Sequence, residues 1–533
     1  MPDESQRTLR LNQFRGAAML IMFSVMASRI IGFLRDMYIS RAFGAQGETD
    51  AYVVAFTIPD LLNYLVAGGA LAITFIPILG ALQEKGDEQE GHRVLSIVAT
   101  FLGLILIAGT VAAEFFAPAI LRWYTTRPDG TKWTTEQLAH CVVMTRILIP
   151  GPLFFSIGGL LSAVLYTRGS FLVPALTPLI YNLGTIVGAI ILGKQYGVTS
   201  LAIGTMAGAF LGPFLLPYIA ASRFGVRLRP IFELSNPHFR RWLRTTIPLM
   251  LGVSIVTADD WIIRKVAEGV GTITILNYAK RLTAVPIAVL GQAVGQAAMP
   301  FFSKLVTQGN WPLFRETVDR SVSRSVMGGI FAVSLLEAIS LPVVRLVYQG
   351  GKFNGEQAQQ ASVYFSIFML SLGLWIAQGI YSRAYYATGN TFAPMLLSTI
   401  VTVASIPMYR WLFNAFGNTG LAWASNFAIL VQTLSLAWLL HRREMLQMSR
   451  DRWLEVLRAI VAAAAAWAAA GLVVRYMEPP VYHKLTEAGT ALAAILVWIA
   501  AVAILSHLLH LNQLKAEFAR GLGKLQRRFR LAD

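Results

Sequence analysis

Three charged residues interrupt the first long apolar stretch of the chain. Arg29, Arg35 and Asp36 lie within the segment Ser28-Arg-Ile-Ile-Gly-Phe-Leu-Arg-Asp36. An ionised side chain at the centre of a bilayer costs about 2.5–3.5 kcal/mol on insertion scales, so one that is retained usually faces a partner or a water-filled cavity. Two guanidinium groups placed in this way could bind an anionic ligand. A second interpretation stays open, in which these side chains snorkel to the membrane surface or form a structural ion pair.

The amino-acid composition indicates the class of protein that contains these charges. Hydrophobic residues make up 55% of the 533 residues, and charged residues only 14%, whereas soluble domains carry about 25% charge. The mean hydropathy is +0.57. The apolar stretches exceed the roughly 20 residues that a helical span requires, and no alternating pattern suggests a barrel. The sequence therefore predicts an all-α polytopic membrane protein. No small-residue cleavage site follows the first apolar run, so we expect this span to be retained.

Fourteen spans can be drawn along the chain. They cover 16–39, 51–81, 94–120, 139–165, 171–192, 198–221, 243–264, 272–303, 322–346, 360–383, 391–413, 419–440, 455–476 and 486–509. If the N-terminus is cytoplasmic, the basic clusters at 223–244, 304–324, 442–458 and 515–530 all fall on the cytoplasmic side. The positive-inside rule then places both termini in the cytoplasm. The net charge of +17 is spread over these loops, so we expect anionic membrane lipids rather than nucleic acid as its partner.

The chain also contains an internal repeat at an ungapped offset of 220 residues. Ser162, Tyr166, Gly169, Pro174, Leu176, Ile180, Ile186, Leu192, Gly197, Thr199, Leu201 and Ala202 match Ser382, Tyr386, Gly389, Pro394, Leu396, Ile400, Ile406, Leu412, Gly417, Thr419, Leu421 and Ala422. The offset relates spans four to six to spans ten to twelve, which indicates two six-helix lobes in a parallel repeat. We expect an N-lobe at 1–222, a C-lobe at 223–445, two further spans at 446–512 and a basic amphipathic tail helix at 513–533 on the cytoplasmic leaflet.

Proline and glycine break the second and eighth spans. The second contains Pro59 and Gly68-Gly69, and the eighth contains Pro286 and Gly291. Such residues mark where membrane helices bend around a cavity, and Lys280-Arg281 precede the break in the eighth span. Ordinary proline kinks are the alternative interpretation.

Several motifs resemble one known family. They are Ser28-Arg29-x-x-Gly32-Phe33-x-Arg35-Asp36, Phe43-Gly44-Ala45, Thr49-Asp50-Ala51, Ala55-Phe56-x-x-Pro59, Tyr278-Ala279-x-Arg281-Leu282-x-x-x-Pro286-x-x-Val289-Leu290-Gly291 and Tyr348-x-x-Gly351-Lys352-Phe353. Together they resemble the MurJ (MviN) family, the lipid II flippases of bacterial peptidoglycan synthesis, over essentially the whole chain. The resemblance implies the multidrug/oligosaccharidyl-lipid/polysaccharide exporter fold, with two six-helix lobes around a V-shaped cavity in the bacterial inner membrane.

The resemblance also implies roles for individual residues. Arginines on the first, second and eighth spans line the cavity of the family, and Arg35 and Arg281 match two of them. Asp36 and Asp50 match acidic family positions. The sequence departs from the family where Asn63 stands in place of a cavity arginine, and where Gly68 replaces a glutamate. These departures raise a second hypothesis, that the substrate is another polyprenyl-linked glycan.

The chemistry of such a substrate fits arginine, because the planar guanidinium donates two parallel hydrogen bonds to a diphosphate. Asp36 is expected to pair with an arginine when the site is empty. Asp259 and Asp260 in the seventh span could bind Na⁺ or H⁺ and couple transport to an ion gradient, or could pair with Arg264 or Lys265 one turn away.

Other chemistry finds little support in the sequence. Cys141 is the only cysteine, which excludes internal disulfides and thiolate metal sites. The histidines lack metal-ligand spacing, and no phosphate loop, nucleophile elbow or catalytic carboxylate pair is found. We therefore expect a monomeric transporter without a bound cofactor, driven by a Na⁺ or H⁺ gradient or by the membrane potential. Alternatives are an ion-coupled small-molecule exporter of the same fold and, least favoured, a polyprenyl-phosphate enzyme.

Overall fold

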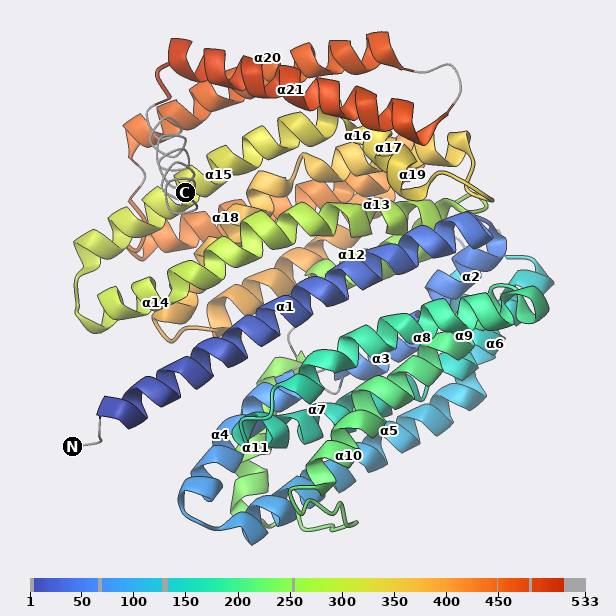
Figure 1. Cartoon of the computed structure of the whole chain (residues 1–533), viewed down its shortest axis with the longest axis vertical. Coiled ribbons are helices and arrows are strands. Elements are labelled where there is room, and N and C mark those ends of the chain that lie inside the picture. Colours follow the sequence, from blue (N-terminus) through green and yellow to red (C-terminus); the bar gives the residue numbers. More distant parts are fainter. Residues whose placement is uncertain are drawn as a thin grey trace. The chain divides into compact units, whose positions relative to one another are not determined.

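The computed structural model describes residues 4–65, 70–126, 133–251, 255–447, 449–478 and 482–511 (Figure 1). Within these ranges the chain is helical and contains no strand, which confirms the predicted fold class. In this described part of the chain, eight helices are long and apolar enough to cross a membrane, or up to ten if two bent helix pairs each form one span. The expected spans at 391–413 and 419–440 are the two halves of one long helix, Phe392–Arg442, which is interrupted at Gly417. Each of the others coincides with one helix or with a group of shorter helices, and the total of fourteen stays a prediction. Gly68, Gly69 and the tail at 513–533 lie outside the described residues.

The first compact unit comprises Met1–Gly252 and Gly350–Lys352. Its helical segments are α1 (Glu4–Phe43), α2 (Gly47–Ala55), α3 (Thr57–Leu65), α4 (Ala70–Glu84), α5 (Glu88–Thr125), α6 (Thr135–Leu148), α7 (Gly151–Thr167), α8 (Leu172–Tyr196), α9 (Thr199–Ala209), the π-helical η1 (Phe210–Leu215), α10 (Leu216–Ser222) and α11 (Pro237–Leu251). The unit extends past residue 222, the expected lobe boundary, because α11 packs against α4 and α5. Trp242 of α11 is 0% exposed.

Glycines bring α8 and α9 into backbone contact. A Cβ atom on Gly184 would lie 2.5 Å from the Cα of Gly208, and one on Gly188 would lie 2.4 Å from the Cα of Gly204. Small residues spaced four apart allow membrane helices to approach this closely, so that van der Waals contact and not apolar burial holds them together. The spacing of these glycines therefore explains the tight packing of the two helices.

The second unit comprises Val253–Gln349 and Phe353–Asp533. Its helical segments are α12 (Ile255–Val266), α13 (Thr272–Pro286), the π-helical η2 (Ile287–Gln292), α14 (Ala293–Thr307), α15 (Trp311–Ala338), α16 (Ser340–Tyr348), α17 (Gly355–Met369), α18 (Leu372–Ala387), α19 (Phe392–Arg442), α20 (Arg450–Met477) and α21 (Lys484–Leu508). Figure 1 shows α20 and α21 lying side by side, and α20 packs along α15. A row of buried alanines on α20, which includes Ala459 and Ala466, permits this contact.

The repeat is visible in the backbone at two pairs of glycines. Gly197 ends α8 with φ 53° and ψ −135°, and Gly417 interrupts α19 with φ 59° and ψ −141°. Gly169 and Gly389 have φ values of 71° and 76°. The members of each pair are 220 residues apart. A positive φ favours glycine because it has no Cβ, so the two halves share the same turns as well as the same residues.

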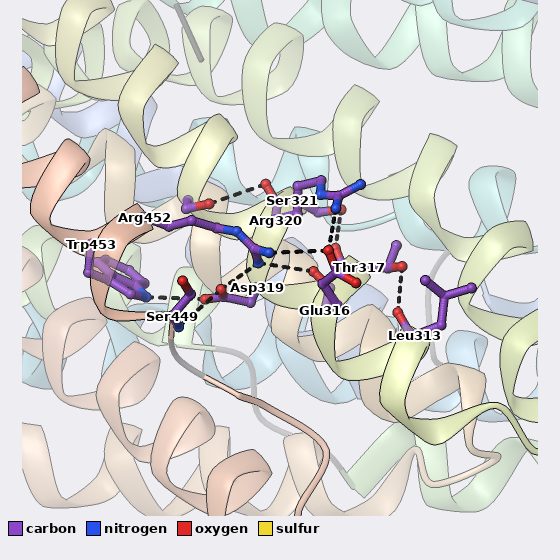
Figure 2. A network of polar contacts seen from close by, with 10 residues as sticks. Leu313, Glu316, Thr317, Asp319, Arg320, Ser321, Ser449, Arg452 and Trp453 are labelled. Carbon is purple, nitrogen blue, oxygen red and sulfur yellow. Dashed lines mark hydrogen bonds and ion pairs between the residues drawn. The ribbon is translucent and has the colours of Figure 1, made fainter. Parts of the chain in front are cut away.

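A buried ionic network ties α20 to α15 near the N-terminal end of α20 (Figure 2). The Asp319 side chain is 1% exposed and accepts a hydrogen bond from Arg452 Nη1 at 2.7 Å. It also accepts from Trp453 Nε1 and from the Ser449 amide, each at 3.2 Å. Arg452 Nη2 extends the network to Glu316 Oε1 at 3.3 Å. The carboxylate is thus paired and hydrogen-bonded, as a buried charge must be.

A second ionic contact joins the C-terminal helices to α16. Arg345 Nη1 donates to Glu487 Oε1 at 2.8 Å, and the Glu487 side chain is 1% exposed. Arg345 Nη2 lies 3.1 Å from Glu478, and the Tyr482 hydroxyl donates to the Arg345 carbonyl at 3.1 Å. The pair formed by α20 and α21 is therefore attached to the rest of its unit by two separate sets of charges.

Candidate functional site

Arg35 forms a polar cluster on α1 in the first unit. Its Nε and Nη2 atoms donate to Asp36 Oδ1 at 3.0 and 2.9 Å, and its Nη1 atom donates to Asn182 Oδ1 of α8 at 2.8 Å. The guanidinium is largely buried. Because several of its N–H groups already have acceptors, an anionic ligand would have to compete with Asp36 or Asn182 for them.

Asn182 was not anticipated from the sequence, and α8 holds it in place. Its Nδ2 atom donates to the Pro178 carbonyl at 3.0 Å. Pro178 lacks an N–H and leaves the carbonyl four residues earlier without its helical donor. The Thr177 hydroxyl donates to that carbonyl, which belongs to Pro174, at 3.0 Å. A polar amide one turn after a proline in an apolar span is a signal that could have identified Asn182.

The other candidates of the first unit lie apart from this cluster in the chain. Arg29 is exposed on α1. Asp50 is buried in the first turn of α2, where the helix N-terminus favours negative charge. Asn63 is half-buried on α3 and lines a small cavity, of about 170 Å³, together with Pro59 and Asp60. The structure thus joins Arg35 to Asp36 and places Asn63 beside Pro59.

Both expected broken spans are irregular in the structure. Phe56 separates α2 from α3, and Pro59 lies in the first turn of α3, where its missing N–H costs little. Pro286 is the last residue of α13, and the π-helical η2 that follows contains Gly291. Short π-helical segments are rare and occur frequently at functional sites.

A polar cavity of about 850 Å³ lies within the second unit. It is lined by Asp259, Asp260, Arg264, Asn277, Lys280, Arg281, Thr283, Ala284, Ile287, Gly291, Phe368, Ser371, Trp375, Gln378, Gly379, Ser382, Arg383, Tyr386, Ser425 and Asn426. Four of these residues are basic and two are acidic, so the wall of the cavity carries excess positive charge. Such a cavity is suited to a large anionic ligand.

Lys280 pairs with both carboxylates of this cavity. Its Nζ lies 2.5 Å from Asp259 Oδ2 and also donates to Asp260 Oδ1. The hydroxyls of Tyr409 and Ser425, from the two halves of α19, donate to Asp259 Oδ1. The sequence suggested Arg264 and Lys265 on the same helix as partners. The Arg264 charge does act on Asp260, and the partner that the sequence did not identify is Lys280, which comes from α13.

The residues that line this cavity are therefore better suited to bind an anion than a metal ion. Among the described residues, no group of three or more histidine, cysteine, aspartate or glutamate side chains could hold a metal ion. Asp259 and Asp260 remain the candidates for ion coupling, and an ammonium group now lies against both.

Comparison with known proteins decides the family. A family model described as "Lipid II flippase MurJ" matches residues 39–507. The chain belongs to the MurJ family. It is 26% identical over 471 residues to the lipid II flippase MurJ of Burkholderia cenocepacia, which covers 85% of this chain and 88% of the relative. It is 25% identical to the probable lipid II flippase MurJ of Buchnera aphidicola subsp. Acyrthosiphon pisum, with 83% and 87% covered.

Solved structures agree on the fold. A MurJ lipid II flippase in an inward closed conformation matches with a TM-score of 0.74 at 22% identity, covering 92% of this chain and 99% of the other. An inward-facing multidrug transporter of the MATE family in the MOP superfamily matches with a TM-score of 0.66 at 14% identity, covering 80% and 98%. The MurJ family consists of membrane transporters, so the expectation of a transporter and not an enzyme is confirmed.

Proposed function

We propose that this protein moves lipid II, a polyprenyl-diphosphate-linked sugar, from the inner to the outer leaflet of the bacterial inner membrane for peptidoglycan synthesis. Membership of the MurJ family supports the substrate, and the observation that carries the proposal is the positively charged cavity of 850 Å³ in an apolar, helical protein. A diphosphate headgroup requires charge-assisted donors, and Arg281 lies in the wall of this cavity.

Alternating access is the mechanism that we propose for this movement. Two lobes related by a parallel repeat would open in turn to the two sides of the membrane. The irregular segments at Pro59 and at Pro286–Gly291 are where we expect the helices to bend. Asp36 would hold Arg35 while the site is empty, and the diphosphate would take over hydrogen bonds from Asp36. Arg29 and Asp50 are proposed to contribute to the same substrate site.

We also propose an energy source for transport. A Na⁺ or H⁺ gradient, acting at Asp259 and Asp260, or the membrane potential acting on the charged groups would drive transport. Because Lys280 lies against both carboxylates, a Na⁺ ion could enter this position only after the ammonium group had moved away.

We further propose that both termini face the cytoplasm, that the protein acts as a monomer, and that its basic loops contact anionic lipids. Single cysteines at Gly130 and Ser449, in a Cys141→Ser background, test the orientation. An impermeant thiol reagent should label only the Gly130 site in intact cells. Labelling of both sites, or of Ser449 alone, would contradict the orientation.

Complementation tests the function directly. The gene should restore growth to a bacterium depleted of its own lipid II flippase, and the purified protein should translocate lipid II in vesicles. Failure in both assays, with the protein present in the membrane, would exclude lipid II as the substrate.

Asn63 favours a second candidate, a flippase for another polyprenyl-linked glycan. Because this residue lines the small cavity of the first unit, the absence of the arginine found in typical family members could alter headgroup binding there. Vesicles that contain other polyprenyl-linked glycans would distinguish the two substrates. The multidrug transporters share only the fold with this chain, and an exporter of small molecules remains the third candidate.

A further inference from the structure

Arg383 is a cavity residue that the sequence did not single out. It lies on α18, near the end of an expected span, and lines the 850 Å³ cavity of the second unit together with Arg281 and Lys280 of α13. Its side chain is half-buried. An arginine at membrane depth is costly unless a counter-charge, water or ligand compensates it.

Two glycines leave room for the Arg383 guanidinium. A Cβ atom on Gly295 of α14 would lie 2.4 Å from Nη1 and 2.7 Å from Cζ, and one on Gly379 would lie 3.3 Å from Nη1. Alanine at Gly295 would therefore displace the guanidinium group. The backbone of these two helices thus forms a slot for one planar cation.

The slot satisfies only part of the hydrogen-bonding capacity of the guanidinium. Nη1 donates to the Gly379 carbonyl at 2.9 Å, while an arginine has five N–H donors. Among the described residues, Arg383 has no carboxylate within ion-pair distance. In the same unit Lys280, Arg345 and Arg452 each pair with two carboxylates. Arg383 thus presents to the cavity a charge that no carboxylate of the described residues pairs with.

We infer that Arg383 is an anion-binding residue of this cavity, which donates to the diphosphate of the polyprenyl-linked substrate. The inference rests on the proposed function and adds a ligand-binding residue to it. Arg281, on α13, and Arg383, on α18, line the cavity from two different helices. A diphosphate has oxygens on two phosphorus atoms, so it can accept from two guanidinium groups at once.

A structural role at the helix end is the competing explanation. Arg383 precedes Ala387, the last residue of α18, by four residues, and a cation near a helix C-terminus is stabilised by the helix dipole. Lysine would preserve that role because it keeps the charge. Lysine would not replace the paired, coplanar N–H donors that the Arg383 guanidinium holds between Gly295 and Gly379.

The test measures binding to the full-length protein in nanodiscs with three probes: undecaprenyl diphosphate, inorganic diphosphate and undecaprenol. Arg383→Gln and Arg383→Lys should each weaken binding of both diphosphates by about tenfold or more, as expected for the loss of a charge-assisted hydrogen bond. Undecaprenol binding should not change, because it lacks phosphate. Arg458→Gln removes an exposed arginine of α20 and serves as the matched control, which should bind all probes as the wild type does.

Gly295→Ala supplies a second variant that keeps Arg383. It should weaken diphosphate binding to a similar extent, and should add nothing further in the Arg383→Gln background, because both changes remove the same contact. Thermal melts of each variant identify any loss of folding, and wild-type affinity for diphosphate in a folded Arg383→Gln protein would overturn the inference. Wild-type affinity for diphosphate in the Arg383→Lys protein would show that Arg383 stabilises the C-terminal end of α18 instead.

Translocation of lipid II by the wild-type protein distinguishes a failure of the proposed function from a failure of the role assigned to Arg383. If the wild type neither binds undecaprenyl diphosphate nor moves lipid II, the proposed function fails. If the wild type does both and the Arg383→Gln protein binds as tightly, the role of Arg383 alone is refuted.

Discussion

Replacing Lys280 by methionine should make the stability of the protein depend on Na⁺. Methionine has a similar length and no charge, so the change leaves Asp259 and Asp260 without their shared ammonium. The Asp259 side chain is 11% exposed and keeps the hydroxyls of Tyr409 and Ser425, whereas Asp260 is 42% exposed. Most of the expected loss of folding stability therefore comes from Asp259, whose charge stays buried without a cation.

The size of the penalty follows from the burial of this pair. Removing one partner of a buried ion pair costs about 3–5 kcal/mol, and the partial exposure of Asp260 places the expected loss near the lower end, about 3 kcal/mol. A Na⁺ ion that occupied the vacated position would restore stability by mass action. At one hundred times its dissociation constant it would return about 2.7 kcal/mol.

Thermal unfolding in a mild detergent, followed by tryptophan fluorescence, measures both effects. The Lys280→Met protein should melt below the wild type in choline chloride and recover most of the difference in sodium chloride. Lys280→Met combined with Asp259→Asn and Asp260→Asn should melt close to the wild type and should not respond to Na⁺. Equal melting of Lys280→Met and wild type in choline chloride would refute the reasoning, and so would a triple variant as unstable as the single one.

Three further outcomes are expected. Arg35→Ala and Arg281→Ala should each abolish complementation at normal membrane levels, because each removes a proposed diphosphate ligand; full growth with either would remove that residue from the proposed site. Asn63→Arg should be tolerated or improve lipid II translocation if lipid II is the substrate, and should impair the native activity if the site is adapted to another glycan; unchanged transport of every glycan would show that this position is not part of the site. Arg452→Met should lower stability by about 3–5 kcal/mol, because Asp319 stays buried without its cation; a melting temperature equal to that of the wild type would show that the pair is dispensable.

The sequence predicts the architecture of this protein better than its site. Hydropathy locates the helices because each span must be predominantly apolar over about 20 residues. The repeat locates the turns at Gly197 and Gly417, because a positive φ restricts the residue type. The end of the first unit was not predictable in this way, since it depends on where α11 packs and not on its composition.

The contacts within the site depend on tertiary packing and were mostly missed. Helix periodicity predicts partners one turn apart, such as Arg264 for Asp260, whose charges do interact. It does not predict Lys280, which α13 brings to the pair. Asn182 reaches Arg35 because α8 packs on α1. Arg383 could have been found, because the argument that singled out Arg35 applies to any charge within an apolar span.

The ionic attachment of α20 and α21 has a consequence for the biosynthesis of the chain. Asp319 and Arg452 are 133 residues apart, and Arg345 and Glu487 are 142 apart. At about 5–20 residues per second, the ribosome needs roughly 7–28 s to make the second member of each pair after the first. During that interval α15 and α16 carry charges whose partners do not yet exist, so we expect them to wait at the insertion machinery or at the membrane surface. The last two helices would then complete the insertion of helices made earlier, and a ribosome that stalls before residue 450 would leave an unpaired aspartate in a nascent membrane protein.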